Sequence, residues 1–324
     1  MGEAAASRLF EQAAAIARAG RPEDGVRFIE ATADSGDPAA NFILAHWLLY
    51  GSDRPRDAAA ACRRLDSAAR HGNADALRVL AHLTASGTGC HPDRETALDL
   101  LGKAAKSDAI AAGELALLPR VPDIEDSNSA VREQICDDPN IEIVRGLLCG
   151  EECAWLMERA KPLLKPSLID DGRTAIGRPD PIRTSHGATF VPHEADLVVQ
   201  GVTGRIAAVT GTQAGHAEAL YVMRYAPGQQ YRPHLDALPN LKNQREWTAI
   251  AYLNDAFEGG ATAFPELGLS LRLGVGDLLV FRNSGPDQQP DVRMRHAGEP
   301  VTAGEKWVAT RWIRHGPHDP YDRG

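Results

Sequence analysis

The chain has few cysteines, no long apolar run and no excess of positive charge. Its five cysteines are odd in number and widely scattered, which suits a reducing cytoplasm better than a disulfide framework. No apolar segment has the length needed to cross a bilayer, and the N-terminus lacks the basic start and apolar stretch of a signal peptide. We therefore expect a cytoplasmic protein without a membrane partner.

The charge balance argues against nucleic acid as a partner. Lysine and arginine number 35 against 44 acidic residues, which gives a formal net charge of −9. No basic stripe interrupts this acidic background, so nucleic-acid binding is not expected. Hydrophobic residues make up 43% of the chain and charged residues 24%, as is typical of a globular protein with a core. At 324 residues, two domains are expected.

The first part of the chain repeats itself at an offset of 36 residues. Gly36-Asp-Pro-Ala-Ala recurs as Gly72-Asn-Ala-Asp-Ala, and Leu44-Ala45-His46 recurs as Leu80-Ala81-His82. A period of this length, with small residues at helix crossings, predicts stacked helix-turn-helix units. We expect residues 23–35 to be the second helix of an incomplete leading repeat and residues 108–118 the first helix of a trailing one. The pattern resembles the Sel-like subclass of tetratricopeptide repeats.

Repeats of this kind commonly present a concave surface to a peptide or protein. The resemblance therefore implies that the repeats hold a partner or a peptide substrate, while a spacer without a ligand is the alternative. His46 and His82 recur with the repeat and are interpreted as packing residues, whereas His193 lies in an expected loop and is interpreted as a surface residue.

Composition divides the chain near residue 120. Residues 1–120 form the expected repeat domain, 121–135 a polar linker with prolines, and 136–324 a second domain. In that domain short β-branched or aromatic runs alternate with Gly, Pro and Asp, which predicts antiparallel β structure. The expected strands are 141–144, 219–225, 248–253, 277–282 and 306–313. The expected helices are 151–164 and 194–210.

A candidate metal site stands out in the second domain. On a strand, His234 and Asp236 project to the same face. With His296 from a distant strand they would supply two imidazoles and one carboxylate, the facial set of non-haem Fe(II) oxygenases. The residue types alone also permit zinc. Lys306, ten residues past His296, adds a cation that could bind the far carboxylate of a dicarboxylic acid.

Several ordered motifs surround these residues. They are Asp170-Asp-Gly-Arg-Thr174, Arg183-Thr-Ser185, Arg224-Tyr225-x-x-Gly228-Gln-x-Tyr231-x-x-His234-x-Asp236, Arg245-x-x-Thr-x-Ile-x-Tyr-Leu-Asn-Asp255, Gly259-Gly-x-Thr262-x-Phe-Pro265, Gly274-x-Gly276 and His296-x-Gly298-x-Pro300-Val-x-x-Gly304-x-Lys306-Trp307. From about Ile141 to Arg314 the chain resembles the prolyl 4-hydroxylase branch of the 2-oxoglutarate- and Fe(II)-dependent dioxygenases. The resemblance implies an α+β chain of two domains, in which an α-solenoid precedes a double-stranded β-helix (jelly roll) with flanking helices.

The resemblance also assigns roles by position. Iron would be held by His234, Asp236 and His296. The distal carboxylate of 2-oxoglutarate would pair with Lys306, assisted by the hydroxyls of Tyr225 and Thr262. The residues near the substrate would be Arg245, Tyr231, Trp312 and, in a covering loop, Arg183.

The implied activity is hydroxylation of an unactivated C–H bond, foremost in a prolyl residue of a protein or peptide. Fe(II), 2-oxoglutarate and O2 would be required, ascorbate would serve as reductant, and succinate and CO2 would be co-products. The presence of Asp236 favours hydroxylation over halogenation, because related halogenases lack this carboxylate. Two departures from the family pattern are the short connection 237–244 and Arg314 in place of a histidine. A hydroxylase of a free amino acid or peptide natural product, and a non-catalytic repeat-based scaffold, remain alternatives.

Overall fold

The structure is a computed structural model that describes residues 2–167, 181–238 and 241–321. Its contacts form two compact units. The first comprises Met1–Arg120 and Pro192–Leu197, and the second comprises Val121–Val191 and Val198–Gly324. Among the described residues, no helix is both long and apolar enough to cross a membrane. The motif at 170–174 lies outside the described residues.

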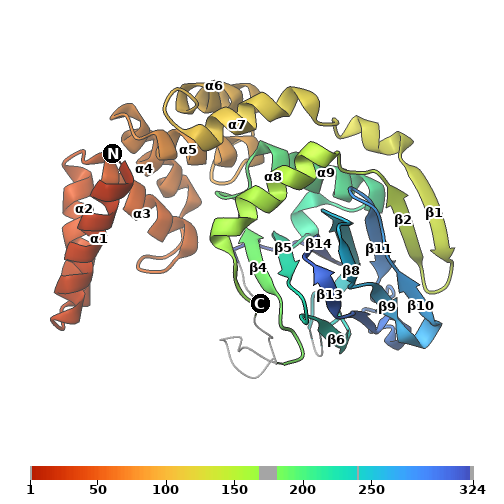
Figure 1. Ribbon diagram of the computed structural model, residues 1–324. Helices are drawn as coiled ribbons and strands as arrows, with labels where there is room; N and C mark the ends of the chain where they lie inside the picture. Colours follow the sequence, from red (N-terminus) through yellow and green to blue (C-terminus); the bar gives the residue numbers. More distant parts are fainter. Residues whose placement is uncertain (1, 168–180, 239–240, 322–324) are drawn as a thin grey trace. The chain divides into compact units, whose positions relative to one another are not determined.

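The first unit is built from helical hairpins (Figure 1). Its helices are α1 (Gly2–Arg18), α2 (Pro22–Asp34), α3 (Pro38–Tyr50), α4 (Ala58–Arg70), α5 (Ala74–Ser86), α6 (Arg94–Ala104) and α7 (Ala109–Leu117), followed by the 3-10 turn η1 (Leu118–Arg120). The 36-residue offset is the spacing of their caps. Asp37 and Asn73 accept hydrogen bonds from the third amide of α3 and α5, and Gly51 and Gly87 end these helices with φ of 70° and 73°. The predicted helical repeats are confirmed.

The leading repeat has two helices, where the sequence predicted only its second. Helix α1 precedes α2 and packs against it through Ala13 and Ile29. The two helices cross closely, since a Cβ at Gly25 would lie 2.6 Å from the carbonyl oxygen of Ala13. Few residues of α1 match those 36 positions further along the chain, so the repeat gave little signal for this helix.

A buried polar cluster lies in the first unit. Glu114 faces His82 Nε2 at 3.0 Å and accepts a hydrogen bond from the Leu197 amide at 2.7 Å. His82 Nδ1 lies 3.2 Å from the carbonyl oxygen of His193. His193 is itself only 3% exposed, and burial lowers its pKa to about 3. The prediction of a surface His193 was wrong, because the segment 192–197 packs within the first unit.

The second unit contains two principal antiparallel sheets. The larger has the order β1-β2-β11-β7-β14-β5-β4-β3, the smaller β10-β9-β12-β6, and a ribbon pairs β13 with β8. The strands are β1 (Val131–Cys136), β2 (Ile141–Arg145), β3 (Lys165–Pro166), β4 (His186–Phe190), β5 (Leu220–Tyr225), β6 (Tyr231–His234), β7 (Arg245–Tyr252), β8 (Phe257–Gly259), β9 (Thr262–Phe264), β10 (Leu269–Leu271), β11 (Leu278–Arg282), β12 (His296–Gly298), β13 (Val301–Gly304) and β14 (Lys306–Arg314).

One apolar core joins the two sheets. Ile250 and Phe281 of the larger sheet belong to the same buried cluster as Phe264 of the smaller one. The sheets share this core without closing into a barrel among the described strands. Figure 1 shows helices α8 (Gly150–Ala160) and α9 (Leu197–Thr210) beside the larger sheet. The predicted α+β organisation is therefore confirmed, as a double sheet with flanking helices.

Some predicted boundaries differ from the observed ones. Helix α8 ends at Ala160 and continues as the 3-10 turn η3 (Lys161–Leu163), and α9 begins at Leu197. Part of the expected linker is structured, since it holds the 3-10 turn η2 (Glu125–Ser129) and most of β1, which pairs with β2. Strand β1 is largely exposed, so it lacks the apolar alternation that would have revealed it.

A buried ion pair joins α8 to α9 and gives a first prediction. Arg205 donates to Glu152 and to the carbonyl oxygen of Pro122, and both charged side chains are almost fully buried. We expect Glu152→Gln to lower the free energy of unfolding by about 3–5 kcal/mol, because it leaves the Arg205 charge buried without a counter-charge. Chemical denaturation would measure the loss. Glu158→Gln, which removes an exposed partner of Lys161, should change stability by less than about 1 kcal/mol. Equal effects would contradict the prediction.

Candidate metal centre

Strand pairing brings the two histidines of the predicted triad together. His234 ends β6 and His296 begins β12, and the two are direct cross-strand partners. Asp236 follows His234 by two residues and is buried. One ligand atom from each of His234, Asp236 and His296 lies within 4.8 Å of the others, which makes these residues a candidate metal site.

The donor set fits a divalent cation. His234 Nδ1 donates to the carbonyl oxygen of Arg232 at 2.8 Å, and His296 Nδ1 donates to that of Met294 at 3.0 Å. These bonds leave both Nε2 atoms as the ligating atoms, as in protein metal sites where the second nitrogen is held by the backbone. Each Nε2 lies 3.5 Å from an oxygen of Asp236.

The charge states suit metal binding. Burial and the neighbouring His234 lower the pKa of His296 to about 4, so His296 is neutral near pH 7. Burial alone would raise the pKa of Asp236, but His296, His234 and Arg245 outweigh it and hold that pKa below its ordinary value. A neutral imidazole and an ionised carboxylate are the forms that ligate a metal. The rings of Phe264 and Phe281 lie beside His296, with centroids at 5.7 Å and 4.7 Å.

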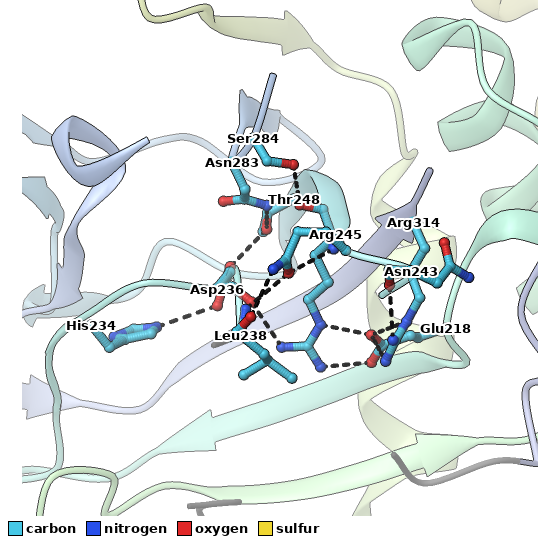
Figure 2. Close-up of polar contacts among 11 residues, drawn as sticks. Glu218, His234, Asp236, Leu238, Asn243, Arg245, Thr248, Asn283, Ser284 and Arg314 are labelled. Carbon is cyan, nitrogen blue, oxygen red and sulfur yellow. Dashed lines mark hydrogen bonds and ion pairs between the residues drawn. The ribbon is translucent and has the colours of Figure 1, made fainter. Parts of the chain in front are cut away.

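A hydrogen-bond relay orients Asp236. Thr248 donates to Asp236 Oδ2 at 2.6 Å, and Asn283 Nδ2 donates to the Thr248 hydroxyl at 2.8 Å (Figure 2). All three residues are buried. The relay fixes the rotation of the carboxylate and leaves Oδ1 facing His234. Thr248 is thus a positioning residue for the candidate site.

A second prediction tests the relay. Thr248→Val keeps the shape of the side chain but removes the donor to Asp236, and we expect it to weaken metal binding by about 10- to 100-fold. Equilibrium dialysis against Fe(II) without oxygen would measure the change. Thr189→Val makes the same replacement at an exposed position of β4 and should leave metal affinity within about twofold. An unchanged affinity in Thr248→Val would show that the relay does not support the metal.

Lys306 is buried among aromatic residues. Its ammonium group donates to the carbonyl oxygen of Gly260 at 2.7 Å and lies 4.8 Å from the Tyr252 ring and 5.8 Å from the Tyr225 ring. Burial lowers the pKa of Lys306 to about 7. Gly260 has a φ of 63°, and a Cβ there would lie 3.3 Å from Lys306 Cδ, so glycine suits this turn.

Hydroxyl groups accompany this ammonium. The Thr262 hydroxyl lies 2.7 Å from that of Tyr252, and the Tyr225 hydroxyl is 3.4 Å from the sulfur of Met223. Lys306, Tyr225, Tyr252 and Thr262 are all buried. In the part of the chain that the structure describes, this ammonium has no carboxylate in hydrogen-bond contact, and hydroxyl groups lie on the rings beside it. Such a setting suits a carboxylate ligand. Tyr252 was absent from the predicted site, although its period-two spacing from Thr248 signals a shared strand face.

The residues predicted to contact substrate lie around the triad. Tyr231 stacks on His234 with ring centroids 3.4 Å apart, and Arg183 lies over the Tyr231 ring at 4.9 Å. Arg245 lies over the Trp312 ring at 4.4 Å and donates to the carbonyl oxygen of Asp236 at 3.3 Å. Tyr231 and Arg245 therefore contact residues of the candidate metal site, whereas Arg183 and Trp312 reach it only through these two side chains.

Glu218 is a further residue beside Arg245 that the sequence did not reveal. Its carboxylate accepts two hydrogen bonds from Arg245, at 2.6 Å and 2.8 Å, and also pairs with Arg314 at 2.8 Å (Figure 2). Burial would raise its pKa, but Arg245 and Arg314 lower it overall. Glu218 lies outside the predicted strands and meets Arg245 only through the fold, so no local pattern marked it.

Comparisons with known protein sequences agree on one protein family. The family described as the 2OG-Fe(II) oxygenase superfamily matches residues 220–314. "Probable prolyl 4-hydroxylase 3" of Arabidopsis thaliana is 34% identical over 205 residues, which cover 56% of this chain and 71% of the relative. "Prolyl 4-hydroxylase 1" of the same plant is 35% identical over 201 residues, covering 56% and 71%.

Solved structures resemble separate parts of the chain. A viral collagen prolyl hydroxylase from Paramecium Bursaria Chlorella virus-1, in a 2OG complex, is 29% identical with a TM-score of 0.46, covering 56% of this chain and 98% of that one. A Sel1 repeat protein from Oxalobacter formigenes is 22% identical with a TM-score of 0.32, covering 34% and 87%.

Proposed function

Because this chain belongs to the prolyl 4-hydroxylase family within the 2OG-Fe(II) oxygenase superfamily, we propose that it hydroxylates a prolyl residue in a protein or peptide. The reaction would convert the C–H bond, 2-oxoglutarate and O2 into an alcohol, succinate and CO2. The observation that carries the proposal is the convergence of His234, Asp236 and His296 on one point. Ascorbate is proposed as the reductant that keeps iron in the ferrous state.

The chain's own residues have distinct tasks in this proposal. His234, Asp236 and His296 would hold Fe(II), which would supply the redox chemistry that O2 needs and leave positions open for other ligands. Lys306 would bind the distal carboxylate of 2-oxoglutarate and so fix its orientation. Phe264 and Phe281 beside His296 would exclude water from the reacting groups.

Succinate formation tests the activity directly. The protein would be incubated with Fe(II), 2-oxoglutarate, ascorbate and O2, with and without prolyl peptides, and products would be analysed by mass spectrometry. We expect peptide-stimulated succinate formation and a peptide that has gained one oxygen atom. Turnover with free proline and not with peptides would favour a small-molecule hydroxylase, which the short 237–244 connection also suits. Absence of both turnover and iron binding would favour the non-catalytic scaffold.

The repeat unit is proposed to hold the substrate protein. A groove of about 640 Å³ lies between α2 and α4, and it is lined by Glu30, Asn41, Leu48, Arg54, Arg63 and Arg64, among other residues. Arg54 pairs with Glu30, whereas exposed Arg63 makes no ion pair within the described contacts. Arginine side chains thus outnumber carboxylates in the lining of the groove. This excess of positive charge suits an acidic segment of a substrate protein.

A third prediction tests this docking. Arg63→Glu should raise the KM for an intact substrate protein by about 5- to 10-fold, because it places a like charge opposite the acidic segment. The KM for a short prolyl peptide should stay within about twofold, since such a peptide lacks the acidic segment that we propose to dock in the groove. Steady-state kinetics on both substrates would separate the two effects. Equal changes for both substrates would argue against docking in the groove.

A cytoplasmic location stays a proposal that rests on the scattered cysteines.

A further inference from the structure

A row of aromatic rings and guanidinium groups lies beside the candidate metal site. It runs through Tyr231, Arg183, Tyr221, Trp312 and Arg245, which we name the arginine–aromatic row. Arg183 lies 4.9 Å from the Tyr231 ring and 5.0 Å from the Tyr221 ring. Tyr221 and Trp312 have ring centroids 6.0 Å apart, and Arg245 lies 4.4 Å from the Trp312 ring.

Both ends of the row touch the triad. Tyr231 stacks on His234, and Arg245 donates to the carbonyl oxygen of Asp236. The side chains of the row therefore border the space next to the metal ligands. A substrate that reacts at the metal would lie beside the two ends of this row. The aromatic faces suit the apolar ring of a prolyl residue. A prolyl ring carries no charge, so it does not explain why two arginine side chains lie in the same row.

Three buried polar groups along the row lack a hydrogen-bond partner among the described residues. Arg183 Nε, Thr310 Oγ1 and Trp312 Nε1 are buried and make no hydrogen bond in the part of the chain that the structure describes. Thr310 is the cross-strand partner of Tyr221, and it lies two residues from Trp312 on the same strand. Buried donors normally find acceptors, and leaving one unsatisfied costs about 1–3 kcal/mol. A ligand with acceptor oxygens would satisfy them.

The charges beside the row do not balance. Arg183 is 9% exposed, and its guanidinium group contacts the Met223 sulfur and two tyrosine rings, with no carboxylate partner among the described residues. Glu218 is shared between Arg245 and Arg314. Asp236 faces the two histidines. The row thus carries an excess of positive charge in a low-dielectric setting, where an anion is bound strongly.

We propose that the substrate carries a carboxylate close to the carbon that is hydroxylated, and that Arg183 binds this carboxylate. Thr310 and Trp312 supply further donors to the same substrate, and the rings of Tyr221 and Tyr231 hold its apolar part. This inference rests on the proposed function and narrows its substrate class. The carboxylate belongs either to the C-terminus of the substrate or to an acidic side chain beside the reacting residue.

Two pairs of peptides distinguish these sources. The first pair is acetyl-Gly-Pro with a free carboxylate and the same peptide as the amide. The second is acetyl-Gly-Pro-Glu-amide and acetyl-Gly-Pro-Gln-amide. Their binding to protein loaded with Fe(II) and 2-oxoglutarate would be measured by calorimetry without oxygen, so that no turnover takes place. We expect the charged member of one pair to bind about 10- to 100-fold more tightly than its neutral counterpart.

Replacement of the arginine assigns the effect to Arg183. In Arg183→Gln the preference for the charged peptide should fall to within about twofold, because the cation that binds the carboxylate is gone. Arg94→Gln removes an exposed arginine at the start of α6 and should retain the full preference. If Arg183→Gln does not fold, the comparison of charged and neutral peptides with the unaltered protein still decides the proposal.

The outcomes separate this inference from the activity on which it rests. Equal binding of charged and neutral peptides, together with succinate formation from prolyl peptides, would overturn the carboxylate site alone. A charge preference that survives in Arg183→Gln would overturn the assignment to Arg183. Lack of peptide binding, succinate formation and iron binding would overturn both the inference and the proposed activity.

Discussion

Replacing His296 with alanine is expected to abolish Fe(II) retention and all succinate formation. The change removes one of two imidazoles and leaves His234 and Asp236 as a two-residue site with one side open. Loss of a direct ligand should cost more than the 10- to 100-fold that outer contacts typically contribute to metal affinity. Iron content after anaerobic loading and desalting, followed by the succinate assay, would measure the effect.

Exposed His91 provides the matched control. His91→Ala makes the same substitution outside the candidate site and should retain iron and activity. Circular dichroism of His296→Ala would establish that the variant is folded, since the apolar core around Phe264 and Phe281 remains. A folded His296→Ala protein that binds Fe(II) as well as the unaltered chain would show that the metal site has been assigned to the wrong residues.

Lys306→Ala should weaken 2-oxoglutarate binding by at least about 10- to 100-fold while leaving Fe(II) retention nearly unchanged. The substitution removes the ammonium group that we propose to pair with the distal carboxylate, and a charged hydrogen bond of this kind contributes about 1.5–3 kcal/mol. Titration of the iron-loaded proteins with 2-oxoglutarate, without oxygen, would give its dissociation constants for the unaltered protein and for Lys306→Ala. Parallel loss of iron in Lys306→Ala and His296→Ala would contradict the separate roles of these residues.

The pH dependence of the same titration gives an internal control. Burial lowers the pKa of Lys306 to about 7, so the lysine is charged below that pH and neutral above it. Since the charged form binds the carboxylate, affinity should be highest below pH 7 and fall by about tenfold for each pH unit well above it. Lys306→Ala should lack this dependence. A constant affinity in the unaltered protein between pH 6 and pH 9 would contradict the proposed contact.

The sequence predicted part of the candidate metal site because neighbouring positions of a chain lie close together. His234 and Asp236 are two positions apart, and that spacing would place them on one face of an extended segment. In the structure β6 ends at His234, and Asp236 lies in the bend that follows. The partnership of His234 with His296 is a matter of strand register, which no spacing within either segment contains. It could be expected only through the surrounding motifs and the family that they resemble.

Other features could not be predicted from the sequence, because they depend on contacts between segments that are far apart along the chain. Glu218 meets Arg245 and Arg314 only after β5, β7 and β14 have paired, so its role was invisible in the sequence. His193 was placed on the surface because its neighbours look like a loop, yet tertiary packing buries it. The caps Asp37 and Gly51 have counterparts 36 residues later in Asn73 and Gly87, because capping is a local property of the helix ends.

Strand β6 lies at the edge of the smaller sheet and pairs there with β12 through an irregular register. An edge strand of four residues gains little stability from its own hydrogen bonds. A metal ion bound by His234, Asp236 and His296 would cross-link this edge to its neighbour, so metal occupancy and local order would be one linked equilibrium. Depletion of iron would then reduce the order of β6, which begins at Tyr231. The protein would bind substrate more weakly as well as lose its reactivity.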